Sequence, residues 1–67
     1  MLSLRINGED RQFPAPMTVA GLLDQLALAG KRVAVERNGE IVPKSRHGDT
    51  ALQSGDRLEI VVAVGGG

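Results

Sequence analysis

The segment Arg57-Leu58-Glu59-Ile60-Val61-Val62-Ala63-Val64 is an almost continuous apolar run in a chain of 67 residues. Such a run is typical of a strand in the interior of a sheet. Because side chains alternate between the two faces of a strand, one face should join the core. That face carries Leu58, Ile60, Val62 and Val64. The other face should display Val61 and Ala63 as a small apolar surface for a partner protein, unless the helix or a loop covers them.

Two strands are predicted before this one, at the start of the chain. Residues 2–6 alternate between apolar and polar, which is the pattern of a strand with one buried face. Asn7-Gly8 favours a two-residue hairpin turn, so residues 9–13 should pair back on the first strand. Phe13 is the only aromatic residue, and we expect it in the core.

A helix is predicted between Thr18 and Gly30. Thr18 is a favourable N-cap, and Met17 and Leu22 have the spacing of a hydrophobic staple. Apolar residues follow at the spacing of one helical face, namely Val19, Leu22, Leu23 and Leu26. Gly30 precedes two basic residues and is predicted to end the helix as its C′ glycine.

A second hairpin follows the helix. Val33 and Val35 open a strand, Asn38-Gly39 supplies the turn, and a short strand through residues 41–42 stops at Pro43. The predicted order is ββαβββ, an α+β fold of the β-grasp (ubiquitin-like) type. A five-stranded mixed sheet should pack on one main helix, with the last strand parallel to the first. We expect residues 1–64 to form a single domain and residues 65–67 a flexible tail.

Composition argues against several classes of function. Eight basic and eight acidic residues cancel, so we expect neither a nucleic-acid nor a membrane partner. No apolar stretch approaches the roughly 20 residues of a membrane span, and a cytoplasmic monomer is the default expectation. The chain has no cysteine and one histidine, so we predict no metal site, no catalytic residue and no bound cofactor. His47 is interpreted as a solvated loop residue, and Asp49 and Asp56 as turn residues.

The last three residues, Gly65, Gly66 and Gly67, are the part of the sequence that could take part in a reaction. Residues without side chains form a thin strip that a narrow active site could admit, and three of them would reach about 10 Å. An ordinary frayed terminus is the alternative. A carboxylate becomes reactive when it attacks the α-phosphorus of ATP to form an acyl-adenylate, a step in which a partner enzyme would supply positioning and Mg²⁺. Because cysteine is absent, any sulfur that the chain carries would have to reside on Gly67.

The residues together resemble the ThiS family of sulfur carriers in thiamin biosynthesis. The resemblance covers nearly the whole chain, and its most specific stretches are residues 33–36, 41–43, 55–61 and 63–67. It implies that Gly67 is adenylated by an E1-like enzyme of the ThiF type and converted to a thiocarboxylate. The sulfur would then pass to thiazole synthase of the ThiG type. The implied partner-binding residues are Val61, Ala63, Val64, Gly65 and Gly66, and ATP and Mg²⁺ are used by the activating enzyme.

Three alternatives use the same fold differently. The small subunit of molybdopterin synthase has the same terminal chemistry and another sulfur acceptor. A β-grasp interaction module has no covalent role, so its activity should survive a residue appended after Gly67. A ubiquitin-like modifier would form amide conjugates with other proteins instead of exchanging oxygen for sulfur.

Overall fold

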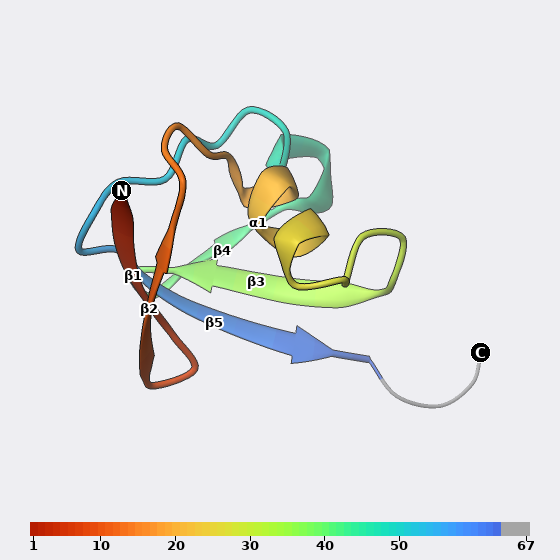
Figure 1. The fold of residues 1–67 in the computed structure, drawn as a ribbon. Helices are drawn as coiled ribbons and strands as arrows, with labels where there is room; N and C mark the ends of the chain where they lie inside the picture. Colours follow the sequence, from red (N-terminus) through yellow and green to blue (C-terminus); the bar gives the residue numbers. More distant parts are fainter. Residues whose placement is uncertain (64–67) are drawn as a thin grey trace.

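The structure is a computed structural model, and it describes residues 1–63. One helix lies on one face of a five-stranded mixed sheet with the strand order β2-β1-β5-β3-β4 (Figure 1). The elements are β1 (Leu2–Ile6), β2 (Glu9–Phe13), α1 (Val19–Gln25), β3 (Val33–Arg37), β4 (Glu40–Val42), the 3₁₀ turn η1 (Lys44–Arg46) and β5 (Arg57–Val62). The predicted β-grasp fold and its element order are confirmed.

The last strand, β5, occupies the centre of the sheet. It pairs in parallel with β1 through Ile6 and Leu58, and antiparallel with β3 from Val33 opposite Val62 to Arg37 opposite Leu58. The interior placement was predicted from the apolar run, and the parallel pairing with β1 was predicted from the β-grasp arrangement. The strand ends at Val62, two residues before the predicted end, although the Ala63 N–H still donates to the Arg32 carbonyl at 2.9 Å.

Both Asn-Gly pairs form the predicted hairpin turns. Asn7 and Gly8 have φ of 51° and 85°, and Asn38 and Gly39 have φ of 52° and 87°. Two successive residues with positive φ define the turn whose twist matches that of the flanking strands. Asparagine and glycine tolerate this conformation better than other residues, which explains why both turns use the same pair.

The helix begins as predicted and ends earlier. Thr18 Oγ1 accepts a hydrogen bond from the Gly21 N–H at 3.1 Å, which confirms the N-cap. The helix stops after Gln25, so the prediction that Gly30 terminates it was wrong. Ala27 takes the left-handed conformation instead, with φ of 60°. The Leu28 N–H donates to Leu23 O and the Ala27 N–H to Asp24 O, which is the Schellman pattern.

The core lies between α1 and the sheet face that the helix covers. Its buried apolar residues are Leu2, Leu4, Ile6, Phe13, Val19, Leu22, Leu23, Val35, Leu52, Leu58 and Ile60. Leu52 comes from the long loop before β5, and its N–H donates to the Met17 carbonyl at 2.9 Å. This bond attaches the loop to the start of the helix, so the loop closes the side of the core that the sheet leaves open.

Candidate functional site

The end of β5 carries the predicted partner surface. Val61 is 63% exposed, Ala63 is exposed, and no described element covers them. Ala34 lies directly opposite Val61 on β3 and is also exposed. These three residues form a small apolar surface, the β5 patch, at the last described residues of the chain. That the patch binds a partner stays a prediction.

Two further exposed residues of this sheet face were not predicted from the sequence. Ala34 belongs to the patch, and Ile41 on β4 is 63% exposed. Glu36 lies between them, paired with Ile41 on one side and Glu59 on the other. The alternation of residues 33–37 puts Ala34 on the face of the strand that points away from the core, so the sequence pattern could have predicted its exposure. Its position beside Val61 depends on the register of two strands.

The predicted core face of β5 is only partly correct. Leu58 and Ile60 are buried, but Val62 is 39% exposed. Val62 pairs with Val33, the first residue of β3, at the margin of the sheet. Neither side chain is fully covered there, because the packing becomes thinner where the strands end. Val64, Gly65, Gly66 and Gly67 lie outside the described residues.

A buried carboxylate anchors the start of β5. Asp56 is only 6% exposed and accepts hydrogen bonds from the Arg37 Nε at 2.8 Å, the Asn38 Nδ2 at 3.1 Å and the Gln53 N–H at 2.8 Å. Burial by itself would raise the pKa of this carboxyl. The hydrogen bonds and the charge of Arg37 outweigh burial and hold the pKa below its ordinary value. Asp56 is therefore a structural anchor, which extends its predicted role as a turn residue.

Each Asn-Gly turn also holds β5 through its asparagine side chain. Asn7 Oδ1 accepts from the Ile60 N–H at 2.8 Å, and Asn7 Nδ2 donates to the Ile60 carbonyl at 3.1 Å. Asn38 Oδ1 accepts from the Arg57 N–H at 2.9 Å. The two amides act like additional strand residues on the two sides of β5. They fix the strand that leads to the β5 patch.

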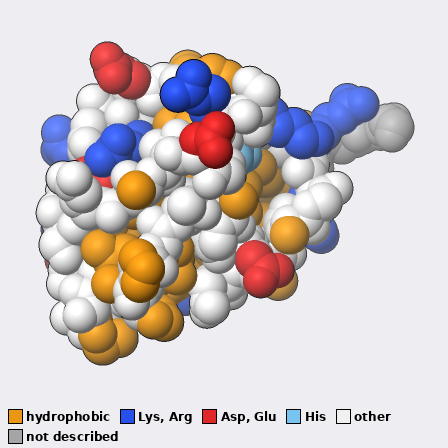
Figure 2. Space-filling view, turned by 90° about the horizontal axis from the view of Figure 1, so that it is seen from above, with side chains coloured by type: hydrophobic (Ala, Val, Ile, Leu, Met, Phe, Trp, Pro, Cys, Tyr) orange, Lys and Arg blue, Asp and Glu red, His pale blue; other side chains and the backbone are white. Residues whose placement is uncertain are grey.

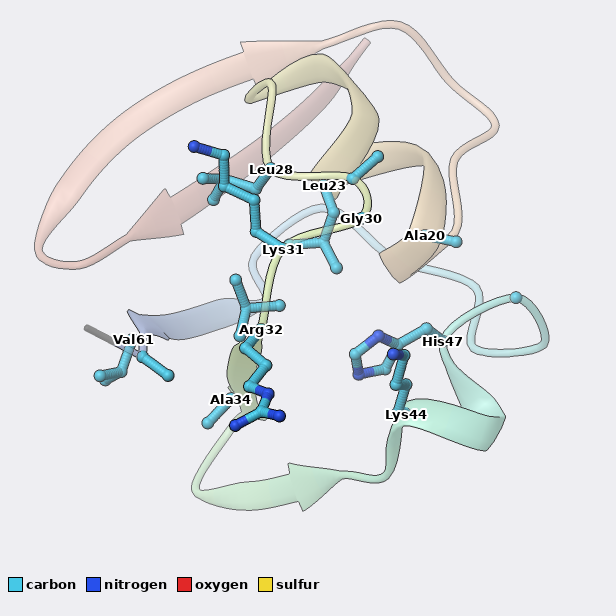
Figure 3. A pocket seen from close by; sticks show the side chains of 14 residues that line it. Ala20, Leu23, Leu28, Gly30, Lys31, Arg32, Ala34, Lys44, His47 and Val61 are labelled. Carbon is cyan, nitrogen blue, oxygen red and sulfur yellow. The ribbon is translucent and has the colours of Figure 1, made fainter. Parts of the chain in front are cut away.

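A groove of about 560 Å³ opens beside the β5 patch (Figure 3). It lies between α1, the α1–β3 loop and the segment around η1, and Ala34, Val61 and Ala63 also line it. In the space-filling view the histidine is partly visible among apolar side chains, with basic side chains and an acidic one nearby (Figure 2). The groove thus connects the helix side of the molecule with the residues where the described chain ends.

His47 lines this groove, and its predicted role as a solvated loop residue was wrong. The side chain is only 8% exposed, and Nε2 lies 3.0 Å from the Val42 carbonyl. Its own carbonyl accepts from the Ala20 N–H at 2.9 Å. The 3₁₀ turn after Pro43 directs the residue inward, and the polar sequence around it gave no sign of that turn.

Neither a cluster of metal ligands nor a membrane-spanning helix is found among the described residues. Among residues 1–63 no three His, Cys, Asp or Glu side chains gather as metal ligands. No helix of this part of the chain is long and apolar enough to cross a membrane. Arg5 and Asp10 form an exposed ion pair at 3.0 Å on the hairpin of β1 and β2, on strands that do not line the groove.

Comparison with known proteins identifies the family. The ThiS family model matches residues 4–67. The chain belongs to the ThiS family. A crystal structure of a thiamine biosynthesis protein (ThiS) from Geobacter metallireducens superposes with a TM-score of 0.82 at 30% identity, covering 98% of this chain and 100% of that one. The expected fold is thereby supported independently of the strand pattern.

Two curated relatives extend the comparison. The sulfur carrier protein ThiS of Bacillus subtilis is 42% identical over 65 residues, which cover 96% of this chain and 98% of that protein. A thiazole synthase of Paramagnetospirillum magneticum is 54% identical over 66 residues, which cover 98% of this chain. The chain spans 20% of the length of that thiazole synthase.

Proposed function

We propose that this chain is a sulfur carrier of thiamin biosynthesis that bears the sulfur on the carboxyl carbon of Gly67. The observation that carries the proposal is the ThiS family match, which extends through Gly67. It is supported by the likeness to the Bacillus subtilis sulfur carrier over nearly the full length of both chains. The proposal requires that Gly67 present a free carboxylate.

The chemistry takes two steps on that carboxylate. One carboxylate oxygen attacks the α-phosphorus of ATP, the bond to the β-phosphate oxygen breaks, and pyrophosphate leaves. Sulfide then attacks the acyl carbon and AMP departs, which leaves a thiocarboxylate. The partner enzyme supplies the positioning, the Mg²⁺ and the stabilisation of charge on the phosphates. This chain supplies the acid, and its lack of cysteine leaves no thiol to compete for the adenylate.

The folded body holds the strand that precedes the glycines in the sequence. Asn7, Asn38 and Asp56 fix β5 by side-chain hydrogen bonds, so the strand that leads to the glycines starts from a defined position. The exposed β5 patch would give the activating enzyme an apolar surface to hold. Gly65 and Gly66 would then enter the active site, where a side chain would obstruct them.

The proposed partners are an E1-like activating enzyme of the ThiF type and a thiazole synthase of the ThiG type. A segment similar to this chain makes up a fifth of the Paramagnetospirillum magneticum thiazole synthase. Its presence in one polypeptide with that synthase favours thiazole formation over molybdopterin synthesis as the destination of the sulfur.

The experiment combines the chain with the cognate activating enzyme, ATP, Mg²⁺ and a sulfide source, and measures the intact mass. We expect a gain equal to the difference between sulfur and oxygen, located on Gly67. The matched control has one alanine appended after Gly67 and should fold equally well without gaining mass. An unchanged mass of the unmodified chain, under conditions where the enzyme activates a known ThiS protein, would refute the proposal.

A second measurement separates the alternatives. The thiocarboxylate form should support thiazole formation by the thiazole synthase and should not restore sulfur transfer in a molybdopterin synthase that lacks its own small subunit. Amide conjugates in a cell extract supplied with ATP would indicate a ubiquitin-like modifier instead.

A further inference from the structure

The groove beside the β5 patch has features that the proposed function does not use. Leu23 and Leu28 provide apolar lining, and Ala63 lies at its margin. Three basic residues line it, Lys31, Arg32 and Lys44, and none of its described lining residues is acidic. Because the chain as a whole has no net charge, this local excess comes from the arrangement of these residues.

One side of the groove is an open sheet edge. In an antiparallel pair the backbone groups of successive residues point alternately to the two sides of the strand. Arg37 pairs with Glu40 across the two-residue turn, so Arg37, Val35 and Val33 direct their N–H and C=O groups toward the β4 side. β4 ends at Val42, opposite Val35. No strand of residues 1–63 therefore lies opposite Val33 on this side.

The local sequence keeps this edge open. Pro43 lacks an N–H group and precedes η1, which turns the chain away where Lys44 would otherwise face Val33. Arg32 and Lys44 extend from opposite sides of the hollow, with His47 beside Lys44 (Figure 3). A vacant strand position is thus bordered by apolar side chains and two cations.

We infer that this groove binds an extended acidic segment of the partner protein that receives the C-terminal residues. The segment would add a short strand beside Val33, place an apolar side chain against Leu23 and Leu28, and present carboxylates to Arg32 and Lys44. The inference rests on the proposed function, and it adds a strand edge and two cations to the apolar contact at the β5 patch, whose three residues also line the groove. Since Ala34, Val61 and Ala63 all line the groove, one partner can contact the patch and the strand edge together.

The test is a titration of the isotopically labelled full chain with a capped peptide of alternating valine and glutamate, followed by amide NMR shifts. We expect shifts at Val33, Ala34 and Gly48 and none on β2. A peptide with lysine in place of glutamate should produce at most small shifts. Shifts that lie elsewhere, shifts that are equal for the two peptides, or an absence of shifts would overturn the inference.

Charge variants sharpen the test. The double variant Arg32→Glu and Lys44→Glu should weaken binding of the acidic peptide by about tenfold or more at low salt. The matched double variant Arg11→Glu and Arg57→Glu makes the same charge change outside the groove and should bind as the parent does. Equal weakening by both would mean unspecific attraction and would contradict the inference. Thermal unfolding shows whether each variant is folded.

The two proposals fail separately. Peptide binding does not involve Gly67, so it should persist in the chain with an alanine appended after Gly67. Sulfur gain by the parent chain without peptide binding at Val33 would remove the groove inference alone. Peptide binding without sulfur gain would remove the sulfur-carrier proposal.

Discussion

At position 56, a single carboxylate accepts hydrogen bonds from three donors in different parts of the chain. Asp56 bonds to Gln53 within its own turn and to Arg37 and Asn38 at the end of β3. Every buried side-chain nitrogen and oxygen among the described residues has a partner. The carboxylate therefore stabilises the fold while it is ionised, since its donors would otherwise be left without an acceptor.

Asp56→Asn should lower the free energy of unfolding by about 2–3 kcal/mol near pH 7, because charged hydrogen bonds are lost in a buried place. The pKa of Asp56 is lowered by folding, so the stabilisation is present above the unfolded pKa of about 3.9 and is lost as the pH falls through the folded value. Urea unfolding at a series of pH values should show the parent and the variant converging in acid.

Asp10→Asn is the control for that prediction. Asp10 also has a lowered pKa, through its hydrogen bond to Arg5 and the Arg5 charge, but the pair is exposed to water. We expect little change in stability at any pH. A loss at Asp10 as large as that at Asp56 would contradict the assignment of Asp56 as the buried anchor.

At the scale of the element, the end of α1 shows a residue outside its preferred conformation. Ala27 has φ of 60° at the C′ position, where glycine is usual. Leu23 and Leu28, which are joined by a backbone hydrogen bond at 2.8 Å, close the helix around it. The packing of these leucines places the left-handed C′ position at Ala27, three residues before Gly30.

Ala27→Gly should raise the free energy of unfolding by about 0.5–1 kcal/mol. Glycine removes the strain of an alanine in the left-handed conformation, and this gain is larger than the loss caused by the greater freedom of glycine in the unfolded chain. Ala20→Gly makes the same chemical change inside the helix and should lower stability by about 1 kcal/mol. Thermal unfolding of both variants tests the opposite signs. A loss at position 27 would show that the helix end is placed elsewhere in solution.

Substitutions can separate the hydrogen bonds of the asparagine side chain from the conformation of the turn. Asn7→Gly keeps the positive φ and removes only the two bonds to Ile60, so we expect a loss of about 1–2 kcal/mol. Asn7→Ala should lose about 1 kcal/mol more, because alanine is strained at this φ. Equal losses in denaturant unfolding would mean that the turn conformation contributes nothing at this position.

At the scale of the whole molecule, β5 divides its residues between folding and the proposed contact with a partner. Ile60 is buried beneath α1, whereas the neighbouring Val61 is exposed on the opposite face. Ile60 should therefore determine the stability of the fold, and Val61 should determine the affinity for a partner protein. The same strand can do both because adjacent side chains point to opposite faces of the sheet.

Ile60→Ala should cost about 2–5 kcal/mol of unfolding free energy, through lost packing and the cavity that remains. Val61→Ala should change it by less than about 0.5 kcal/mol. Under the proposed function, Val61→Ala should instead raise the KM of the activating enzyme for this chain. Denaturant unfolding and activation kinetics on both variants give the comparison, and a large stability loss at Val61 would refute it.

Local rules were sufficient for most elements of the fold. Period-2 alternation located β1, Asn-Gly located both turns, and Thr18 located the helix start, because each depends on interactions between residues close in the sequence. The apolar run 57–64 placed β5 inside the sheet. The family resemblance implied roles for Gly67, Val61 and Ala63, and the structure adds the exposure of Val61 and the neighbouring Ala34.

The tertiary structure decided what distant residues do together. His47 is buried because η1 turns it toward Val42, and the helix ends before Ala27 because two leucines pack there. Asp56 is ionised in a buried place because Arg37 and Asn38 reach it from the end of another strand. The groove beside Val33 exists because β4 stops early while α1 and the following loop enclose the space. Such features depend on the meeting of segments far apart in the chain, so no local pattern encodes them.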